Sequence, residues 1–234
     1  MRRVVLAVVC FMLLGTYMSA GELNKDSILS KMVDAYGGSE ALSNAVSYTQ
    51  HWRVVRGTDG VEGTDTRRVT LPDRLYVKLS YPDRSETRIL EGSVGIKVFN
   101  NRDKRQASGP MLDAMKVQLM RLYTPLQLKK FENDMRVADE NGRYLLTLSR
   151  DGVECDYYVD PKSFRIVKTV GKLKMGPQTM KFVTIYEKFS KEGGVLMPHR
   201  EIKYAGEVKT ATNTLVDTKF IKIRRVGTHR YEQI

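Results

Sequence analysis

Apolar and polar residues alternate along most of this chain, and such alternation is typical of β-strands that bury one face. The clearest run places Tyr48, Gln50, Trp52 and Val54 on one side of a strand. Pairs rich in Gly, Asp, Asn and Pro separate successive runs and are suited to turns. These criteria predict about twelve antiparallel strands, at residues 48–55, 63–71, 75–81, 87–91, 96–99, 136–139, 143–149, 153–159, 165–170, 179–189, 198–204 and 215–225.

Helical spacing replaces the alternation at two points in the chain. Apolar residues between Ile28 and Tyr36 recur every three or four positions, Asp26 can cap this helix, and the following glycine pair can end it. Further helices are predicted after Ser39, over residues 111–122, and from Pro125 through residue 131.

The overall pattern predicts an α+β domain dominated by one strongly curved antiparallel sheet. No linker, repeat or low-complexity tract interrupts residues 21–234, so we expect a single domain. Residues 100–110 are polar, charged and rich in turn formers, and they are predicted to form an exposed loop before the helix at 111–122.

The first twenty residues have the build of a secretory signal peptide. Arg2 and Arg3 precede an apolar run that ends at residue 14, and small residues follow at Ser19-Ala20-Gly21. The run is too short for a permanent membrane-spanning helix. We therefore predict a signal peptide at residues 1–20, cleaved near Ala20/Gly21, and an exported mature chain. A retained N-terminal anchor is the alternative.

The chain is strongly basic, with 39 Lys and Arg against 27 Asp and Glu. Removal of Arg2 and Arg3 would leave 37 basic residues and a net charge of +10. This surplus favours anionic partners such as phospholipid headgroups, lipopolysaccharide or an acidic protein, and export argues against nucleic acid. The alternative is an ordinary solvated surface, because basic residues occur in nearly every predicted strand.

No motif for catalysis or metal binding is present. His51, His199 and His229 are isolated in sequence, and there is no nucleophile elbow or phosphate-binding glycine loop. Cys155 is the one cysteine of the predicted mature chain, and its position in an alternating strand indicates a buried structural thiol. The sequence therefore predicts no enzyme activity, no metal and no cofactor.

The predicted helix at 111–122 is rich in methionine, with Met111, Met115 and Met120 within ten residues. Flexible thioether side chains adapt to irregular apolar partners, which suits a pocket for acyl chains. The alternative is that these residues simply fill the core. The candidate pocket residues are Tyr48, Trp52, Leu75, Val77 and Leu79 from the sheet, and Met111, Leu112, Met115 and Leu119 from the helix.

Several turn and strand-start sequences resemble those of bacterial periplasmic proteins of the LolA-like lipoprotein-sorting superfamily. They are the helix around Ile28-Leu29, the turn at 36–42 (YGGSEAL), and the segments at 71–75 (LPDRL), 85–92 and 194–200 (GVLMPHR). The resemblance implies that residues 21–234 form an incomplete antiparallel β-barrel, of about 11–12 strands, with helices covering its open concave side. It also implies a periplasmic protein that binds the acyl chains of lipids or lipoproteins in an apolar cavity.

Three functions are compatible with the sequence. The first hypothesis is a periplasmic carrier or chaperone for lipid or lipoprotein, which acts in outer-membrane sorting without catalysis. The second is an envelope protein-interaction or sensor module that uses its basic surface, including Lys129, Lys130 and Arg136, to contact a protein partner or an anionic membrane. A hydrolase of envelope material is the third, and it would need catalytic residues that converge only in the fold.

Overall fold

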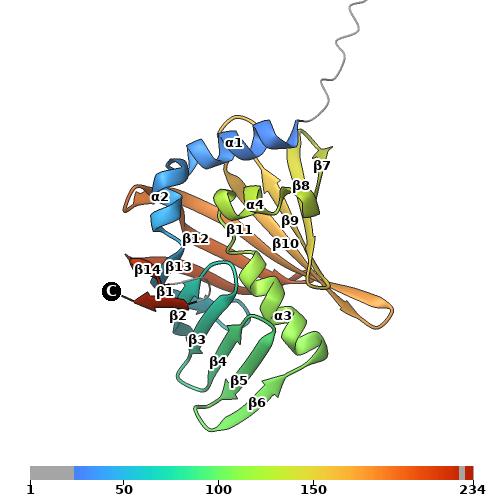
Figure 1. Cartoon of the computed structure of the whole chain (residues 1–234). Coiled ribbons are helices and arrows are strands. Elements are labelled where there is room, and N and C mark those ends of the chain that lie inside the picture. Colours follow the sequence, from blue (N-terminus) through green and yellow to red (C-terminus); the bar gives the residue numbers. More distant parts are fainter. Residues whose placement is uncertain (1–23, 227–229, 234) are drawn as a thin grey trace, which may run out of the picture.

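The computed structural model describes residues 24–226 and 230–233, and its main feature is a sheet of 13 antiparallel strands. The strand order is β6-β5-β4-β3-β2-β1-β13-β12-β11-β10-β9-β8-β7. The end strands β6 and β7 do not pair with each other, so the sheet is open (Figure 1). Two meanders, β1 to β6 and β7 to β13, join where β1 pairs with β13. The predicted large antiparallel sheet is confirmed, with slightly more strands than expected.

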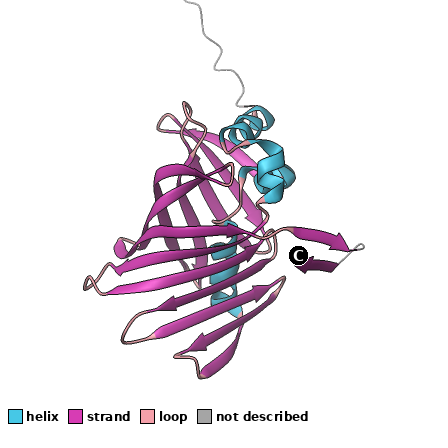
Figure 2. Cartoon of the chain, turned by 90° about the vertical axis from the view of Figure 1, so that its left-hand side faces the viewer, coloured by secondary structure: helices cyan, strands magenta, loops and turns pink. Residues whose placement is uncertain are grey.

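The strand bounds follow the alternation of buried and exposed residues. In β1, residues Tyr48, Gln50, Trp52 and Val54 are buried, as the pattern predicts. The strands are β1 (Ser47–Arg56), β2 (Glu62–Thr70), β3 (Arg74–Ser80), β4 (Ser85–Glu91), β5 (Val94–Phe99), β6 (Asp103–Ala107), β7 (Met135–Glu140), β8 (Arg143–Arg150), β9 (Val153–Val159), β10 (Ile166–Met175), β11 (Gln178–Glu192), β12 (Val195–Ala205) and β13 (Val208–Phe220). A separate two-stranded sheet of β14 (Ile223–Val226) and β15 (Arg230–Gln233) stands apart from the main sheet (Figure 2).

The loop predicted at residues 100–110 is wrong in part, because Asp103–Ala107 form the edge strand β6. Its backbone pairs with β5, but every side chain before Ala107 is exposed. Such a strand has only one buried residue and therefore leaves no alternation in the sequence. The charged side chains suit an edge, since they discourage pairing with another molecule.

The last predicted strand is also corrected. β13 begins at Val208, well before the predicted start at residue 215, and it ends at Phe220. Its buried residues are Ala211, Asn213 and Leu215, whereas Val216 is exposed. Because a buried Asn replaces an apolar residue, the hydrophobic pattern does not mark the first half of this strand.

Four α-helices and one short 3₁₀ turn complete the described structure. The helices are α1 (Lys25–Ala35), α2 (Gly38–Asn44), α3 (Gly109–Met120) and α4 (Pro125–Lys130), and the 3₁₀ turn η1 covers Glu132–Asp134. The predicted start of α4 at Pro125 is confirmed.

Both predicted N-caps at the beginning of the chain are wrong. Asn24, rather than Asp26, caps α1, because its side chain accepts a hydrogen bond from the Ser27 amide at 3.0 Å. α2 begins at Gly38 without a side-chain cap from Ser39. Gly37 precedes it with φ of 113°, and an added Cβ there would lie 2.3 Å from the Gly194 carbonyl oxygen. Glycine is therefore required at this junction.

α3 lies against one face of the sheet and contacts strands of both meanders, namely β4 and β5 on one side and β9 and β10 on the other. It packs closely because glycines face it from each side. An added Cβ on Gly95 would lie 2.8 Å from Leu112 Cδ1, and one on Gly171 would lie 2.1 Å from Val117 Cγ1. Met115, Val117 and the neighbouring strand residues belong to the largest apolar cluster.

Within the described ranges, none of the helices has the length and apolar character needed to cross a membrane. The predicted signal peptide at residues 1–20, with its cleavage point at Ala20/Gly21, lies outside the described residues.

Candidate functional site

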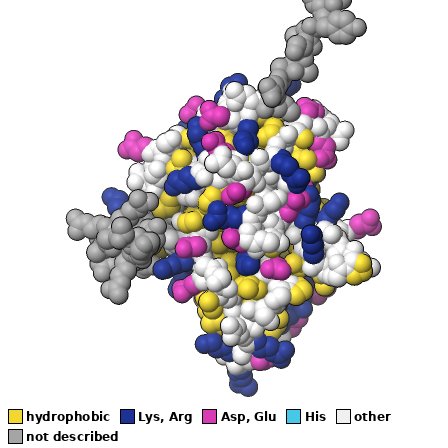
Figure 3. Space-filling view, turned by 45° about the vertical axis from the view of Figure 1, so that its right-hand side comes forward, with side chains coloured by type: hydrophobic (Ala, Val, Ile, Leu, Met, Phe, Trp, Pro, Cys, Tyr) yellow, Lys and Arg dark blue, Asp and Glu magenta, His cyan; other side chains and the backbone are white. Residues whose placement is uncertain are grey.

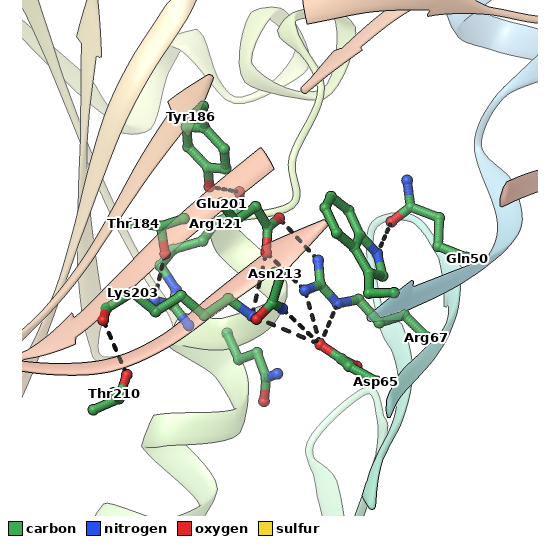
Figure 4. A network of polar contacts seen from close by, with 12 residues as sticks. Gln50, Asp65, Arg67, Arg121, Thr184, Tyr186, Glu201, Lys203, Thr210 and Asn213 are labelled. Atoms are coloured by element: carbon green, nitrogen blue, oxygen red, sulfur yellow. Dashed lines mark hydrogen bonds and ion pairs between the residues drawn. The ribbon is translucent and has the colours of Figure 1, made fainter. Parts of the chain in front are cut away.

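The middle of the sheet carries a buried cluster of charged side chains. Arg67 on β2 donates two hydrogen bonds to Asp65, at 2.8 and 2.9 Å, and two to Glu201 on β12, at 2.7 and 2.9 Å (Figure 4). Lys203 Nζ lies 3.2 Å from Glu201 Oε2. The Asn213 amide on β13 donates to Asp65 at 3.2 Å. Two cations and two carboxylates thus form one balanced network.

This network shows how strongly the sheet bends. β1 and β13 lie between β2 and β12, so the contact from Arg67 to Glu201 crosses three strand spacings. In a flat sheet three spacings are about 14 Å, because neighbouring strands lie about 4.8 Å apart. The two side chains can meet only across the concave side of a curved sheet. We call this contact the Arg67–Glu201 chord.

Trp52 of β1 lies under the chord. The Arg67 guanidinium carbon is 4.5 Å from the centre of the Trp52 ring, a cation–π distance. The Trp52 indole donates to Gln50 Oε1 at 3.2 Å. The face of the aromatic ring therefore stabilises the guanidinium charge.

Electrostatics hold the network ionised. Burial by itself would raise the pKa of Glu201, but Arg67 and Lys203 outweigh it and lower that pKa to about 2. Burial and the nearby Arg67 charge lower the pKa of Lys203 below its ordinary value. Because Glu201 stays ionised and bonded at neutral pH, it is poorly suited to act as a general acid or base. Among residues 24–226 and 230–233, no group of His, Cys, Asp and Glu is arranged to hold a metal.

Arg121, just after α3, faces the network from the helical side. It donates to Thr184 Oγ1 at 3.1 Å, and its backbone carbonyl accepts from the Tyr186 hydroxyl at 3.1 Å. No carboxylate of the described residues lies within 4 Å of its guanidinium, and its buried Nε has no hydrogen-bond partner there. Arg121 is therefore a positive charge without a carboxylate partner among the described residues.

Three cavities lie around the close contact between α3 and the sheet, and Arg121 lines all three. The first, about 90 Å³, lies beside Tyr48, Trp52 and Leu122. The second, about 270 Å³, lies beside Val77, Leu79 and the charged network. The third, about 370 Å³, runs between α3 and the β10–β11 hairpin. We call it the methionine groove, and its apolar lining is Pro110, Met111, Ala114, Met115, Val117, Leu173, Met175, Met180 and Phe182.

The structure does not bring the nine predicted pocket residues into one cavity. Tyr48 and Trp52 line the first cavity and Val77 and Leu79 the second. Met111 and Met115 line the methionine groove. Leu119 borders another cleft of about 370 Å³ on the opposite side of α3, near Tyr123 and Val153. Leu75 and Leu112 line none of these cavities and pack in the main core.

Sequence reasoning missed the charged network, Arg121 and the second wall of the groove. Arg67 and Glu201 are far apart in the chain, so no local spacing signals their contact. Met175 and Met180 could have been found from the sequence, because they flank the Gly176-Pro177 turn of a hairpin, where apolar residues are expected to be exposed. A group of exposed apolar residues at a hairpin tip indicates a binding surface.

The remaining chemistry-bearing residues have structural surroundings. Cys155 is fully buried, as predicted, and burial raises the pKa of its thiol to about 12. His51 and Asp217 pair at 2.8 Å on the exposed face of the sheet. His199 Nε2 lies 3.1 Å from Glu192 Oε1 but without the geometry of a hydrogen bond. The third histidine, His229, lies outside the described residues.

The predicted basic docking residues are partly engaged in ion pairs. Lys129 lies 3.0 Å from Asp26, and Arg136 lies 3.2 Å from Glu154, while Lys130 is exposed. Two of these three charges are therefore balanced locally.

Solved structures provide the comparison that decides the fold. A LolA superfamily protein from Nitrosomonas europaea superposes with a TM-score of 0.53 at 16% identity, over 88% of this chain and 96% of that protein. This chain has a LolA-like fold. A DUF1329 family protein from Desulfovibrio piger also superposes, with a TM-score of 0.51 at 10% identity, over 88% of this chain and 93% of that protein. No family model and no curated protein matches the sequence.

Proposed function

We propose that this protein is a periplasmic carrier or chaperone, which holds the acyl chains of a lipid or lipoprotein for outer-membrane sorting and catalyses no reaction. The observation that carries the proposal is the methionine groove beside α3. Four methionines line it, Met111 and Met115 on α3 and Met175 and Met180 on the hairpin. The LolA-like fold and the predicted signal peptide support the same assignment.

The groove has the size and chemistry that an acyl chain needs. Its volume of about 370 Å³ lies within the range of about 300–1,000 Å³ for small-molecule sites. Each methylene group moved out of water contributes about 0.8 kcal/mol, so part of one chain is enough for useful affinity. Methionine side chains can rearrange around chains of different length. Binding therefore requires no specific polar contact with the hydrocarbon.

The position of α3 suits reversible loading. The helix separates the methionine groove from the cleft beside Leu119, and Arg121 connects the groove to the two inner cavities. A small movement of α3 would enlarge spaces that already exist. A carrier needs such adjustable space, because it must release its cargo as well as bind it.

Native mass spectrometry of the mature protein, purified from its own periplasm, tests the proposal directly. We expect a stoichiometric adduct that releases an acylated molecule on extraction. A folded protein that carries no adduct, and takes up neither added phospholipid nor lipopeptide, would contradict it.

Met180→Glu locates the binding in the groove. Met180 is 39% exposed, so a carboxylate there stays hydrated and the fold should tolerate it. We expect lipid occupancy to fall severalfold while the thermal unfolding temperature changes little. Val216→Glu is the matched control, because Val216 is 67% exposed on β13 and lines none of the cavities described above. Equal occupancy in the two variants would place the lipid elsewhere.

A further inference from the structure

The mouth of the methionine groove is apolar and open to solvent. Met111, Met175 and Met180 are 36%, 45% and 39% exposed, and they make up half of the six large hydrophobic side chains that are exposed in the described parts of the chain. Figure 3 shows hydrophobic side chains on this face of the molecule, interspersed with both basic and acidic groups. The exposed methionines come from α3 and from the hairpin, so they stand on both walls of one groove.

Cations line the same groove. Arg88, Lys97 and Arg121 contribute to its walls, and no acidic residue does. Glu86 compensates part of this charge, because it pairs with Arg88 and lies 3.1 Å from Lys97 Nζ. Arg88 also donates to the Gln118 side chain at 2.9 Å. Arg121 has no carboxylate within 4 Å among the described residues, so the groove keeps a net positive charge.

An acyl chain alone would fill such a groove poorly. It would cover Arg121, which has no carboxylate partner among the described residues, and covering an unpaired charge is unfavourable. A phosphate beside the chain would accept charge-assisted hydrogen bonds from the Arg121 and Arg88 guanidinium groups. The groove therefore combines the two requirements of an amphiphile with a hydrocarbon tail and an anionic head.

We propose that the methionine groove binds an anionic glycerophospholipid, with its acyl chains against the methionines and its phosphate against Arg121, Arg88 and Lys97. This assignment rests on the proposed carrier function and names the class of lipid. The hairpin carries Lys174 and Lys181 next to its methionines, and both are exposed. These charges would draw the mouth of the groove toward an anionic membrane surface.

Three soluble probes separate the contributions of tail and phosphate. They are dihexanoylphosphatidylglycerol, dihexanoylglycerol with the same chains but no phosphate, and glycerol 3-phosphate with no chains. Isothermal titration calorimetry with the folded mature protein measures each affinity at one ionic strength. We expect the phospholipid to bind at least tenfold more tightly than dihexanoylglycerol, and glycerol phosphate to show no saturable binding.

Substitution of the cations assigns the preference to the groove. Arg121→Gln should reduce the phospholipid preference to less than threefold, because the phosphate loses a cationic partner and the uncharged dihexanoylglycerol no longer has to cover an unpaired charge. Arg53→Gln is the control. Arg53 is exposed on β1 and does not line the groove, so this substitution removes the same charge at a site away from the groove. Lys97→Gln provides a second groove variant, and it should also lower the preference. Thermal unfolding establishes that each variant is folded.

The outcomes distinguish the two proposals. Equal affinity for phospholipid and dihexanoylglycerol would overturn the anionic-lipid assignment and leave the carrier function standing. An equal loss in Arg53→Gln and Arg121→Gln would also overturn it, because the charge would then be sensed by the whole surface. If no acylated probe binds the folded protein, the carrier function itself fails.

Discussion

Glu201 carries the clearest consequence of burial for a single residue. Its folded-state pKa of about 2 lies below the ordinary value of 4.5, because Arg67 and Lys203 outweigh the burial that would otherwise raise it. A carboxylate whose pKa is lower in the folded state stabilises the fold at any pH above its unfolded-state pKa. This contribution is lost as the pH falls from about 4.5 through about 2. The shift corresponds to about 3 kcal/mol of the free energy of unfolding.

Glu201→Gln should remove this acid dependence. At pH 7 we expect a loss of about 3–5 kcal/mol in the free energy of unfolding, because Arg67 keeps its buried charge and loses an ionised partner. Between pH 4.5 and 2 the stability of the variant should change less than that of the natural protein. Urea unfolding at several pH values measures both effects, and parallel pH profiles would show that another group controls acid unfolding.

Single residues also mark the limit of sequence reasoning. Cys155 could be placed correctly, because its neighbours alternate and its strand is apolar on one face. Arg67 could not, since nothing near it in the chain distinguishes a buried arginine from a surface one. Its partner Glu201 lies on a strand three places away in the sheet. Such contacts depend on the curvature of the whole sheet.

At the scale of elements, the position of α3 against the sheet depends on two strand glycines. Gly171 leaves room for Val117, and Gly95 leaves room for Leu112 and Met115. The helix itself could be predicted from its periodicity. The position of the helix on the sheet could not be predicted, because a glycine inside a strand indicates a close approach without identifying the partner.

Gly171→Ala should push α3 away from β10. The added Cβ would lie 2.1 Å from Val117 Cγ1, and overpacking of this kind costs about 1–3 kcal/mol. Val117→Ala should recover part of that loss in the double variant, although it is destabilising alone. Chemical unfolding of the two single variants and the double variant measures the coupling, and strictly additive losses would contradict the assigned contact.

At the scale of the whole molecule, Cys155 reports how firmly α3 covers the sheet. It is fully buried on β9, a strand that α3 contacts, and burial raises the pKa of its thiol to about 12. In the mature chain we expect labelling by a thiol reagent at pH 8 to be slow in buffer and rapid in urea. Rapid labelling of the native protein would mean that α3 leaves β9 readily.

The strand order has a further consequence for how the molecule assembles. β1, near the start of the described chain, pairs along most of its length with β13, near the end, and the Arg67–Glu201 chord crosses this same seam. Pairing between such distant segments is slow to form, because a long loop must close first. Within each meander, consecutive strands can pair locally. The concave interior forms only after the two meanders pair with each other. The methionine groove, whose walls come from both meanders, is therefore completed last, once nearly the entire polypeptide is available to fold.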